Sequence, residues 1–344
     1  MYHLDQYHYE LPEALIAQQP ADQRDRSRLL QLQRVSGEMT HGRFADLAGL
    51  LTPGDVLVLN NTRVVPGRLL GRKASGGRVE VLILDFAEGV AKNRFECMVR
   101  ASKRPKPGTN LLFGDGLQAR VEALNGSTSV LSFSGPAPLE QALESIGHVP
   151  LPPYIRRKDT DRDHDNYQTV YARHKGAIAA PTAGLHFTQD LLQRLADKGV
   201  AIVCLTLHVG YGTFVPVRVT DIREHRMHAE WFSLSREAAD TIVNAKQGGG
   251  RVVAVGTTCV RTLEYCAPQP GKIEARSGMC DLFIYPGYRF NIVDAMITNF
   301  HLPQSTLLML VSAFAGRENV LNAYAEAVKE KYRFYSYGDA MLVY

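Results

Sequence analysis

The segment Arg251-Val252-Val253-Ala254-Val255-Gly256-Thr257-Thr258 shows most directly which class of fold this chain adopts. Its apolar, β-branched run predicts a short buried strand, and the spacing of apolar residues over 259–266 predicts a helix directly after it. A strand that leads through a tight turn into a helix is the repeating unit of α/β folds. The segment therefore predicts an α/β fold.

Strands and helices alternate in the same way through the second half of the chain. We expect strands over residues 177–180, 200–208, 251–256, 280–285 and 295–299. We expect helices over residues 189–198, 236–247, 259–266, 306–315 and 319–331. Near the N-terminus we expect strands over 28–32 and 55–59, and helices over 12–18 and 43–51.

Between about residues 63 and 135 the pattern changes. Short runs at 78–86, 94–101, 117–123 and 128–133 are separated by Gly, Pro and Asn clusters, which is typical of antiparallel hairpins. A predicted helix over 138–146 and the prolines of 150–153 mark the return to the first pattern. We therefore predict a large barrel-like α/β domain, residues 1–62 and 150–344, with a small antiparallel β-barrel domain, residues 63–149, inserted in it.

The composition is that of a globular protein of about two domains. The 344 residues include 39 Lys and Arg against 35 Asp and Glu, and a formal charge of +4 permits an anionic partner without requiring one. The five cysteines form no pair with the two-residue gap of zinc or redox motifs, which favours reduced thiols in a cytosolic enzyme. Residues 1–10 lack the apolar run of a signal peptide, and the apolar run 307–314 is too short to cross a bilayer. We expect a cytoplasmic protein with no membrane role.

Polar residues follow the predicted strands, at the ends where α/β folds place their chemistry. Residues 181–187 and 208–214 each contain a histidine, residues 257–261 contain two threonines and an arginine, and residues 299–303 contain an asparagine and a histidine. Loops that follow parallel strands converge on one crevice. We therefore expect these four segments to bring His, Thr, Asn and Arg side chains together.

Several of these segments allow more than one interpretation. The segment 225–230 has two histidines and a glutamate, which suit a metal ion, a substrate contact or structural polar packing. Arg261 follows two threonines at a predicted helix start, where it could bind a ligand carboxylate or pair with Glu264 on its own helix. Gly210 and Gly212 lack the third glycine of a dinucleotide-binding loop, so tight turns are the simpler explanation.

Two basic clusters are candidates for contact with RNA. They are Arg100, Lys103, Arg104 and Lys106 in a predicted hairpin connection, and Arg156, Arg157 and Lys158 after the prolines. Such runs are commonly solvated surface. Next to Tyr154 and Tyr167 they also suit RNA, because cations hold phosphates and aromatic rings stack on unpaired bases.

Longer motifs occur in order over nearly the whole chain. They include Asn60-Asn61-Thr62-Arg63-Val64, Pro150-Leu151-Pro152-Pro153-Tyr154-Ile155, Ala180-Pro181-Thr182-Ala183-Gly184-Leu185-His186-Phe187, His208-Val209-Gly210, Gly256-Thr257-Thr258, Thr298-Asn299-Phe300-His301-Leu302-Pro303 and Tyr335-Ser336-Tyr337-Gly338-Asp339-Ala340-Met341. In these motifs the chain resembles the S-adenosylmethionine:tRNA ribosyltransferase-isomerases of queuosine biosynthesis. Gly67, where that family usually has alanine, and Cys280, where threonine is common, are small departures that leave the implied activity in place.

The resemblance implies a reaction and its substrates. Members of the family transfer the ribosyl moiety of S-adenosylmethionine to 7-aminomethyl-7-deazaguanine at the wobble position of tRNA and isomerise it. The products are epoxyqueuosine-tRNA, adenine and methionine. Because the sulfonium supplies the activation, no cofactor and no metal are expected. The resemblance also implies a large α/β domain with an inserted β-barrel, and we expect a monomer while leaving a dimer open.

The implied reaction needs a base, an acid and residues that orient the substrates. As catalytic residues we predict His186 and His301 first, and His208 and His228 as second candidates. Glu230 is predicted as a further proton donor. The predicted substrate-binding residues are Asn60, Arg63, Tyr154, Thr182, Gly210, Thr213, Thr257, Thr258, Arg261, Asn299 and Ser305. The predicted tRNA-binding residues are Arg100, Lys103, Arg104, Lys106, Arg156 and Arg157.

Two functions of other classes are alternatives. A non-catalytic RNA-binding module would have basic and aromatic surface but would not need several histidine-bearing loops. A metal-dependent hydrolase would use the same histidines and would lose its activity in excess chelator.

Overall fold

The central strands of the large sheet are the most apolar segments of the sequence. β3 (Val56–Asn60), β14 (Val252–Val255) and β16 (Ala295–Asn299) are buried at every residue, and β12 (Ala201–Leu207) lies beside β3. These strands run parallel in the order β12-β3-β14-β16. A parallel sheet that is covered on both faces requires such continuous apolar runs.

Shorter strands extend this sheet on both sides in the computed structural model, which describes residues 2–344 apart from the side chain of Phe214. Beyond β12 lie β13 (Glu230–Leu234) and β15 (Arg276–Cys280), and beyond β16 lie β17 (Ala340–Val343), β1 (Arg28–Leu32) and β2 (Met39–Arg43). The outermost strands, β15 and β2, do not pair with each other. The large domain is therefore α/β as predicted, but its expected barrel-like form is corrected to an open sheet.

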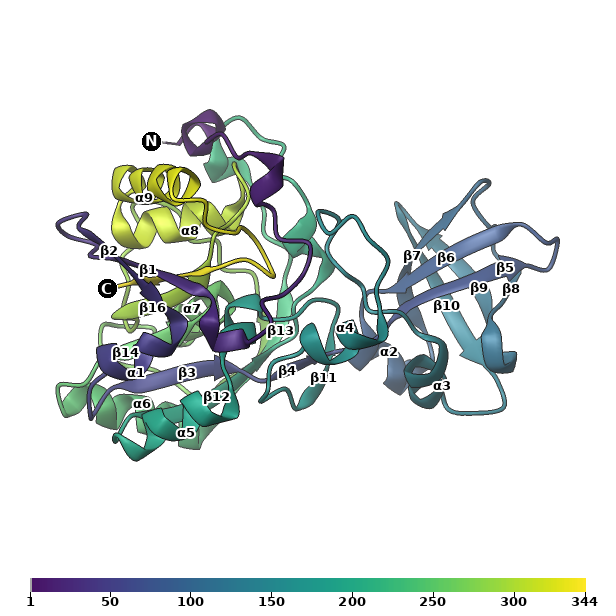
Figure 1. Cartoon of the computed structure of the whole chain (residues 1–344). Coiled ribbons are helices and arrows are strands. Elements are labelled where there is room, and N and C mark those ends of the chain that lie inside the picture. Colours follow the sequence, from purple (N-terminus) through teal and green to yellow (C-terminus); the bar gives the residue numbers. More distant parts are fainter. Residues whose placement is uncertain (1) are drawn as a thin grey trace.

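Helices cover both faces of the large sheet, because successive strand residues point to opposite sides. Val56 and Val58 of β3 belong to one core, with α6, α7, α8 and α9, while Leu57 and Leu59 belong to a second core, with α1 and α5. The helices are α1 (Leu47–Leu50), α5 (Gln189–Asp197), α6 (Arg236–Gln247), α7 (Thr257–Cys266), α8 (Thr306–Ala315) and α9 (Arg317–Lys329). Figure 1 shows these layers next to the separate barrel.

The inserted segment closes into a small antiparallel barrel in the order β10-β7-β6-β5-β8-β9. Alternate residues such as Val79, Val81 and Ile83 point into its own core. Its strands are β5 (Arg68–Lys73), β6 (Arg78–Ile83), β7 (Phe95–Ala101), β8 (Asn110–Leu112), β9 (Gln118–Asn125) and β10 (Thr128–Ser134), with α2 (Phe86–Lys92) and α3 (Leu139–Ile146) at its ends. The inserted barrel is confirmed, while the domain limits at residues 63 and 149 stay a prediction.

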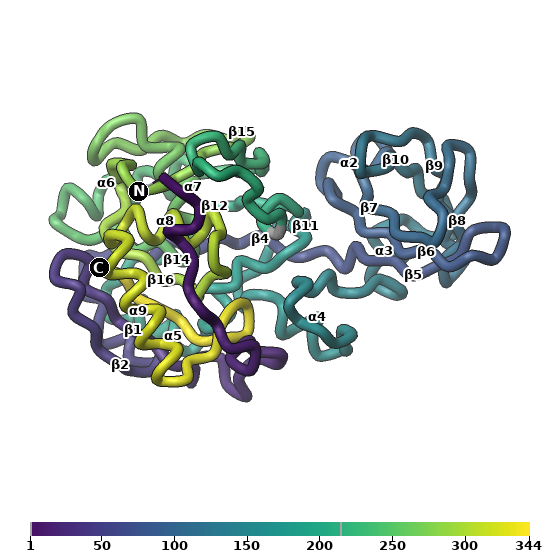
Figure 2. Tube along the Cα trace, turned by 90° about the horizontal axis from the view of Figure 1, so that it is seen from above, coloured from purple at the N-terminus to yellow at the C-terminus, as the bar shows by residue number. Residues whose placement is uncertain are grey.

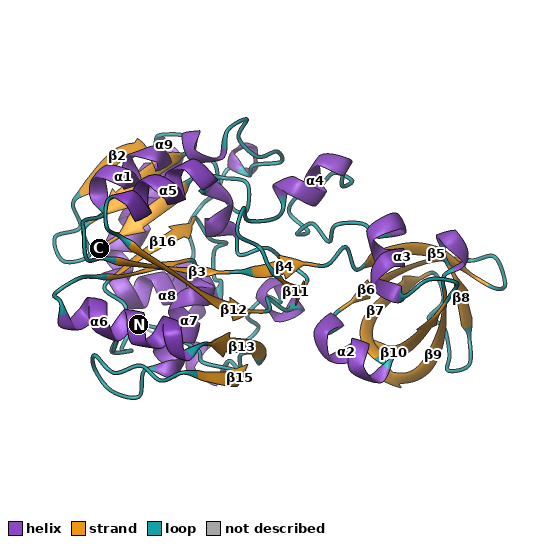
Figure 3. Ribbon diagram, turned by 90° about the horizontal axis from the view of Figure 1, so that it is seen from below, coloured by secondary structure: helices purple, strands orange, loops and turns teal. Residues whose placement is uncertain are grey.

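A narrow connection joins the barrel to the large part. β4 (Thr62–Val64) pairs in parallel with β11 (His174–Ala177), and Figures 2 and 3 show this ribbon between the two parts. After α3 the chain returns through residues 148–160 into α4 (Asp161–Asn166). The barrel therefore stands to one side of the sheet, close to the ends of its central strands.

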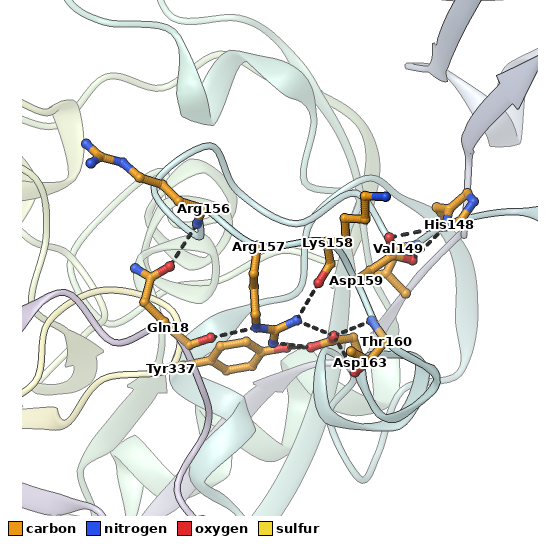
Figure 4. Close-up of polar contacts among 10 residues, drawn as sticks. All are labelled: Gln18, His148, Val149, Arg156, Arg157, Lys158, Asp159, Thr160, Asp163 and Tyr337. Carbon is orange, nitrogen blue, oxygen red and sulfur yellow. Dashed lines mark hydrogen bonds and ion pairs between the residues drawn. The ribbon is translucent and has the colours of Figure 1, made fainter.

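A buried carboxylate holds the returning segment in place (Figure 4). Asp163 is 1% exposed and accepts hydrogen bonds from the Arg157 guanidinium, from the backbone and hydroxyl of Thr160, and from the Tyr337 hydroxyl. Burial alone would raise the pKa of Asp163, but these hydrogen bonds hold it well below its usual range. The cluster joins the linker to the C-terminal part of the chain.

Three predicted elements differ from the observed ones. The predicted strand 177–180 is β11 at His174–Ala177, because the pairing with β4 ends there. The predicted strand 280–285 is β15 at Arg276–Cys280, because its pairing with β13 ends at Cys280. The predicted helix 12–18 is one 3-10 turn at Glu13–Leu15, because Ile16 forms a β-bridge with Phe334.

Further 3-10 turns connect the larger elements. They lie at Leu4–Tyr7, Arg24–Arg26, Phe44–Asp46, Gly114–Gly116, Thr182–His186, Tyr211–Phe214 and Ile222–Glu224. Among residues 2–344, no helix has the length and apolar character needed to cross a membrane.

Candidate active site

A cavity of about 740 Å³ opens where β12, β14 and β16 end at one edge of the large sheet. Its wall is formed by the segments that follow these strands, by residues 179–183 and by residues 335–336. The predicted site residues on this wall are Tyr154, Thr182, Thr213, Thr257, Thr258, Asn299, His301 and Ser305. The structure thus brings together residues from all four of the predicted loop segments.

His301 borders this cavity. Its Nε2 lies 2.8 Å from Thr298 Oγ1, and its backbone N–H donates to the Tyr324 hydroxyl oxygen at 2.9 Å. Burial lowers the pKa of His301 to about 3, so the imidazole is neutral near pH 7. Its Nδ1 makes no hydrogen bond with residues 2–344, which leaves one ring nitrogen available to a ligand.

His186 lies behind the cavity wall and contacts it through Asn299. The Asn299 amide donates to His186 Nε2 at 3.1 Å, so His186 Nδ1 carries the proton and donates to Ser27 Oγ at 2.7 Å. Asn299 Oδ1 accepts from Thr182 Oγ1 at 2.8 Å. Burial lowers the pKa of His186 to about 3, and its ring stacks on Phe44. Both ring nitrogens have hydrogen-bond partners, so His186 holds Asn299 in orientation at the wall, and its predicted catalytic role stays a prediction.

Two helices begin at the cavity wall. Gly256, at a φ of 87°, makes the sharp turn from β14 into α7, and Thr257 and Thr258 form the first turn of that helix. Ser305 begins α8, and its Oγ accepts from the Leu308 N–H at 3.2 Å. Backbone N–H groups at a helix start lack intrahelical partners and attract negative ligand groups. The wall is therefore suited to a carboxylate.

Arg261 and Glu230 form a buried ion pair, each 4% exposed. Arg261 also donates to two backbone oxygens, and Glu230 accepts from the Gly210 N–H at 2.8 Å and from Thr213 Oγ1 at 3.3 Å. Arg261 therefore pairs with Glu230 and not with Glu264, while substrate binding by Arg261 and proton donation by Glu230 stay predictions. The pair and Gly210 position the loop 210–213.

Asn60 at the end of β3 and Arg63 in β4 do not line the cavity themselves. Asn60 is fully buried, donates to the Leu207 carbonyl oxygen at 3.0 Å, and accepts from the N–H groups of Leu207 and Thr62. These bonds fasten β3 to β12, and the Asn60 amide also donates to Thr258 Oγ1 on the cavity wall at 3.3 Å, so the substrate contact of Asn60 stays a prediction. Arg63 points into solvent because Thr62 and Val64 take the buried face of β4, so it does not line the cavity either.

A second cavity of about 1070 Å³ lies between the barrel and the large part. His208 borders it, and burial lowers the pKa of His208 to about 4. His228 is exposed beside Gly212. Neither histidine lines the first cavity: His208 borders the second cavity and His228 faces solvent, and their predicted catalytic roles stay predictions.

The segment 225–230 does not fold into a metal site. His225 packs edge-to-face on Phe283, His228 is exposed, and Glu230 is turned toward Arg261. In the part of the chain that the structure describes, no group of three or more His, Cys, Asp or Glu side chains lies close enough to hold a metal ion. Nothing in this geometry favours a metal-dependent hydrolase.

Part of the cavity wall carries hydroxyl groups, of which Tyr154 was predicted from the sequence and those of residues 335–336 were not. Ser336 Oγ lies 2.7 Å from the Tyr154 hydroxyl, and Tyr335, at a φ of 70°, packs on the Tyr154 ring. The Tyr167 hydroxyl is buried at the same wall without a hydrogen bond of ordinary geometry. Burial raises the pKa of Tyr154 to about 12, so it stays protonated. The hydroxyl residues of 335–337 were the available signal, and strained positions such as Tyr335 tend to occur at functional sites.

The basic residues predicted to bind tRNA fall into two groups. Arg104 donates to two backbone oxygens of the β9–β10 turn, and Arg157 is engaged by Asp163. Their guanidinium groups hold the fold, and their predicted contacts with phosphate stay predictions. Arg100, Lys103, Arg104, Lys106 and Arg156 are exposed, and Arg156 pairs with Glu13 at the surface.

Comparison with known proteins gives consistent matches over the whole chain. A family model described as queuosine biosynthesis protein matches residues 4–343. An S-adenosylmethionine:tRNA ribosyltransferase-isomerase of Pelobacter propionicus is 54% identical over 339 residues, which cover 98% of each chain, and one of Syntrophotalea carbinolica is 52% identical over 341 residues, 99% of each. The crystal structure of an S-adenosylmethionine tRNA ribosyltransferase from Thermotoga maritima matches with a TM-score of 0.56 and 37% identity, over 98% of this chain and 100% of that one. The chain belongs to the queuosine biosynthesis protein family.

Proposed function

We propose that this chain is an S-adenosylmethionine:tRNA ribosyltransferase-isomerase, like the relatives that carry this name. It transfers the ribosyl moiety of S-adenosylmethionine to 7-aminomethyl-7-deazaguanine at the wobble position of tRNA and isomerises it. Epoxyqueuosine-tRNA forms, and adenine and methionine leave. The observation that carries the proposal is the cavity at the strand ends, where the neutral His301, two helix starts and a hydroxyl wall meet.

His301 is the proposed base. The sulfonium acidifies the adjacent 5′ C–H, and a neutral imidazole can accept that proton. If Nε2 carries the ring proton and donates it to Thr298 Oγ1, Nδ1 keeps a free lone pair for this step. Burial makes His301 a weak base in the free protein, and the carboxylate of bound methionine would raise its pKa. The accepted proton is then available to the departing adenine.

The cavity wall supports two further steps. The attacking amine must be neutral, and the apolar Ala179, Val209 and Phe300 on the wall disfavour its charged form by desolvation. The starts of α7 and α8 can hold the methionine carboxylate. His186 acts as a positioning residue, because it fixes Asn299 at the wall.

The partners and location follow from the reaction. tRNA and S-adenosylmethionine are the partners, the cytoplasm is the compartment, and no cofactor is required because the sulfonium carries the activation. We propose that the protein acts as a monomer. A measurement of the mass in solution distinguishes a monomer from a dimer.

The decisive experiment follows the ribose carbon atoms of S-adenosylmethionine into the tRNA. The protein is incubated with precursor-bearing tRNA and S-adenosylmethionine labelled in its ribose, and the label is expected in the tRNA, with adenine and methionine released in equal amounts. Label in the methyl group should not be transferred, and excess chelator should leave the rate unchanged. Transfer of the methyl label, or tRNA that binds without retaining ribose label, would falsify the proposal.

A further inference from the structure

The cavity between the barrel and the large part contains an aromatic pair that the proposed reaction does not use. Trp231 is 41% exposed, and its ring stacks on His208 with centroids 5.0 Å apart and planes at 21°. Met279, its cross-strand neighbour on β15, is 52% exposed. Both border the second cavity. Large apolar side chains that are exposed side by side indicate a contact surface.

The aromatic pair is held in a fixed orientation. His208 Nδ1 lies 2.8 Å from Thr62 Oγ1, which fixes the plane of the imidazole. Gly176 leaves the space that this ring occupies, because a Cβ atom at Gly176 would lie 2.6 Å from His208 Nε2. Trp231 is therefore stacked on a ring that cannot turn. A platform that is already ordered loses little conformational entropy when a flat ligand stacks on it.

The charges around this cavity favour a nucleobase over a phosphate. Its charged lining residues are all acidic: Asp85 and Glu88 from the barrel, of which Glu88 is paired with Lys92, and Glu230, which is paired with Arg261. Carboxylates repel phosphate, whereas they accept hydrogen bonds from the amino groups of bases. An aromatic platform next to carboxylates thus suits an uncharged base with an amino group.

The two cavities are neighbours. Val209 borders both, and the loop from His208 to Gly210 forms the partition between them. Figure 3 shows α2 of the barrel across from β13 and β15, which is where the second cavity lies. Bases of an anticodon loop are unpaired, so a neighbour of the reacting base can be splayed out and stacked on an aromatic side chain.

We propose that Trp231, stacked on His208, is the platform for an unpaired base of the tRNA next to the base that is modified. This inference rests on the proposed function, which supplies the tRNA. Stacking holds the loop open while the target base lies in the first cavity. The platform accepts any base by its face, and Asp85 and Glu88 add a preference for bases with amino groups.

The fluorescence of Trp231 tests this directly, because the chain contains one tryptophan. Saturation with precursor-bearing tRNA is expected to quench this fluorescence, whereas S-adenosylmethionine alone or an RNA duplex should not. An abasic site on one side of the target base should abolish the quenching and so identify the stacked nucleotide. Binding of tRNA, measured in parallel by gel shift, with unchanged fluorescence would overturn the inference, and failure to bind tRNA would overturn the proposed function as well.

Substitutions provide a second test. Trp231→Ala is expected to raise the KM for tRNA about fivefold to a hundredfold, as removal of one base–aromatic stack does elsewhere, without changing the KM for S-adenosylmethionine. Trp231→Phe should recover part of this effect. Val35→Ala is the control, since Val35 is 90% exposed in the turn between β1 and β2, away from the barrel (Figure 1). Equal tRNA KM values in Trp231→Ala and the control, with an active wild type, would reject the platform and leave the proposed function intact.

Discussion

His186 and His301 show how neighbouring groups give two histidines different roles. Burial lowers the pKa of each to about 3, so both are neutral near pH 7. His186 has a partner at each ring nitrogen, whereas His301 has Thr298 at one and borders the cavity with the other unengaged. The residue type alone predicted both as catalytic, and only their hydrogen bonds separate the base from the positioning residue.

Removal of the proposed base is the first prediction. His301→Ala is expected to lower kcat by about 10²–10⁴, the usual contribution of a general base, with tRNA affinity close to that of the wild type. Thr298→Val keeps the ring but removes its hydroxyl partner, so a smaller decrease is expected. Single-turnover transfer of the labelled ribose measures both. Near-normal turnover in folded His301→Ala would remove His301 from the mechanism.

The buried His186 predicts how stability depends on pH. Its pKa is about 3 in the folded protein and about 6.5 in the unfolded chain, so below pH 6.5 unfolding takes up a proton. The free energy of unfolding is therefore highest above that pH and falls toward pH 3, by about 1.4 kcal/mol per pH unit for one such group. His186→Gln, which keeps hydrogen-bonding groups but does not titrate, should show a shallower fall between pH 6 and 4 in urea unfolding. An identical slope in the wild type and the variant would contradict the assignment.

At the scale of elements, the sequence predicted those strands and helices whose positions depend on the local pattern of apolar residues. The central strands, α6 and α8 lie where the apolar periodicity placed them, because their burial is continuous or repeats with the helical period. β2, β5 and β8 were missed because they are partly exposed, and β13 and β17 were missed because they pair only with strands far away in the sequence. For the same reason Glu230 and Arg261 could not be paired in advance, although each was recognised as important.

The ion pair between β13 and α7 predicts a decrease in stability rather than in chemistry. Glu230→Ala leaves the buried Arg261 charge uncompensated, and removal of one partner from such a pair typically costs about 3–5 kcal/mol. The double variant Glu230→Ala with Arg261→Met should recover part of this. Urea unfolding measures both, with turnover recorded alongside. Unchanged stability with abolished turnover would favour Glu230 as a proton donor.

At the scale of the whole molecule, the barrel and the sheet place two cavities next to each other. The sequence indicated an inserted barrel, but not that α2 would close a cavity against β13 and β15, because such an arrangement depends on the angle of the narrow β4–β11 ribbon. The reacting cavity lies on the large part, and the basic side chains Arg100, Lys103 and Lys106 lie exposed on the barrel. Under the proposed function, the large part would carry out the chemistry and the barrel would bind the phosphates of the tRNA.

That separation predicts that a change of charge on the barrel affects the binding of tRNA but not the binding of S-adenosylmethionine. Lys103→Glu combined with Lys106→Glu should raise the KM for tRNA, spare that for S-adenosylmethionine, and reduce the slope of log affinity against log salt by roughly 0.7–0.9 for each phosphate that the barrel no longer binds. Arg104 is left intact because it holds the β9–β10 turn. Lys272→Glu combined with Lys331→Glu makes the same change in net charge on the large part. Equal effects in both double variants would assign the change to overall charge, and an unchanged tRNA KM in the barrel variant would assign that surface to solvent.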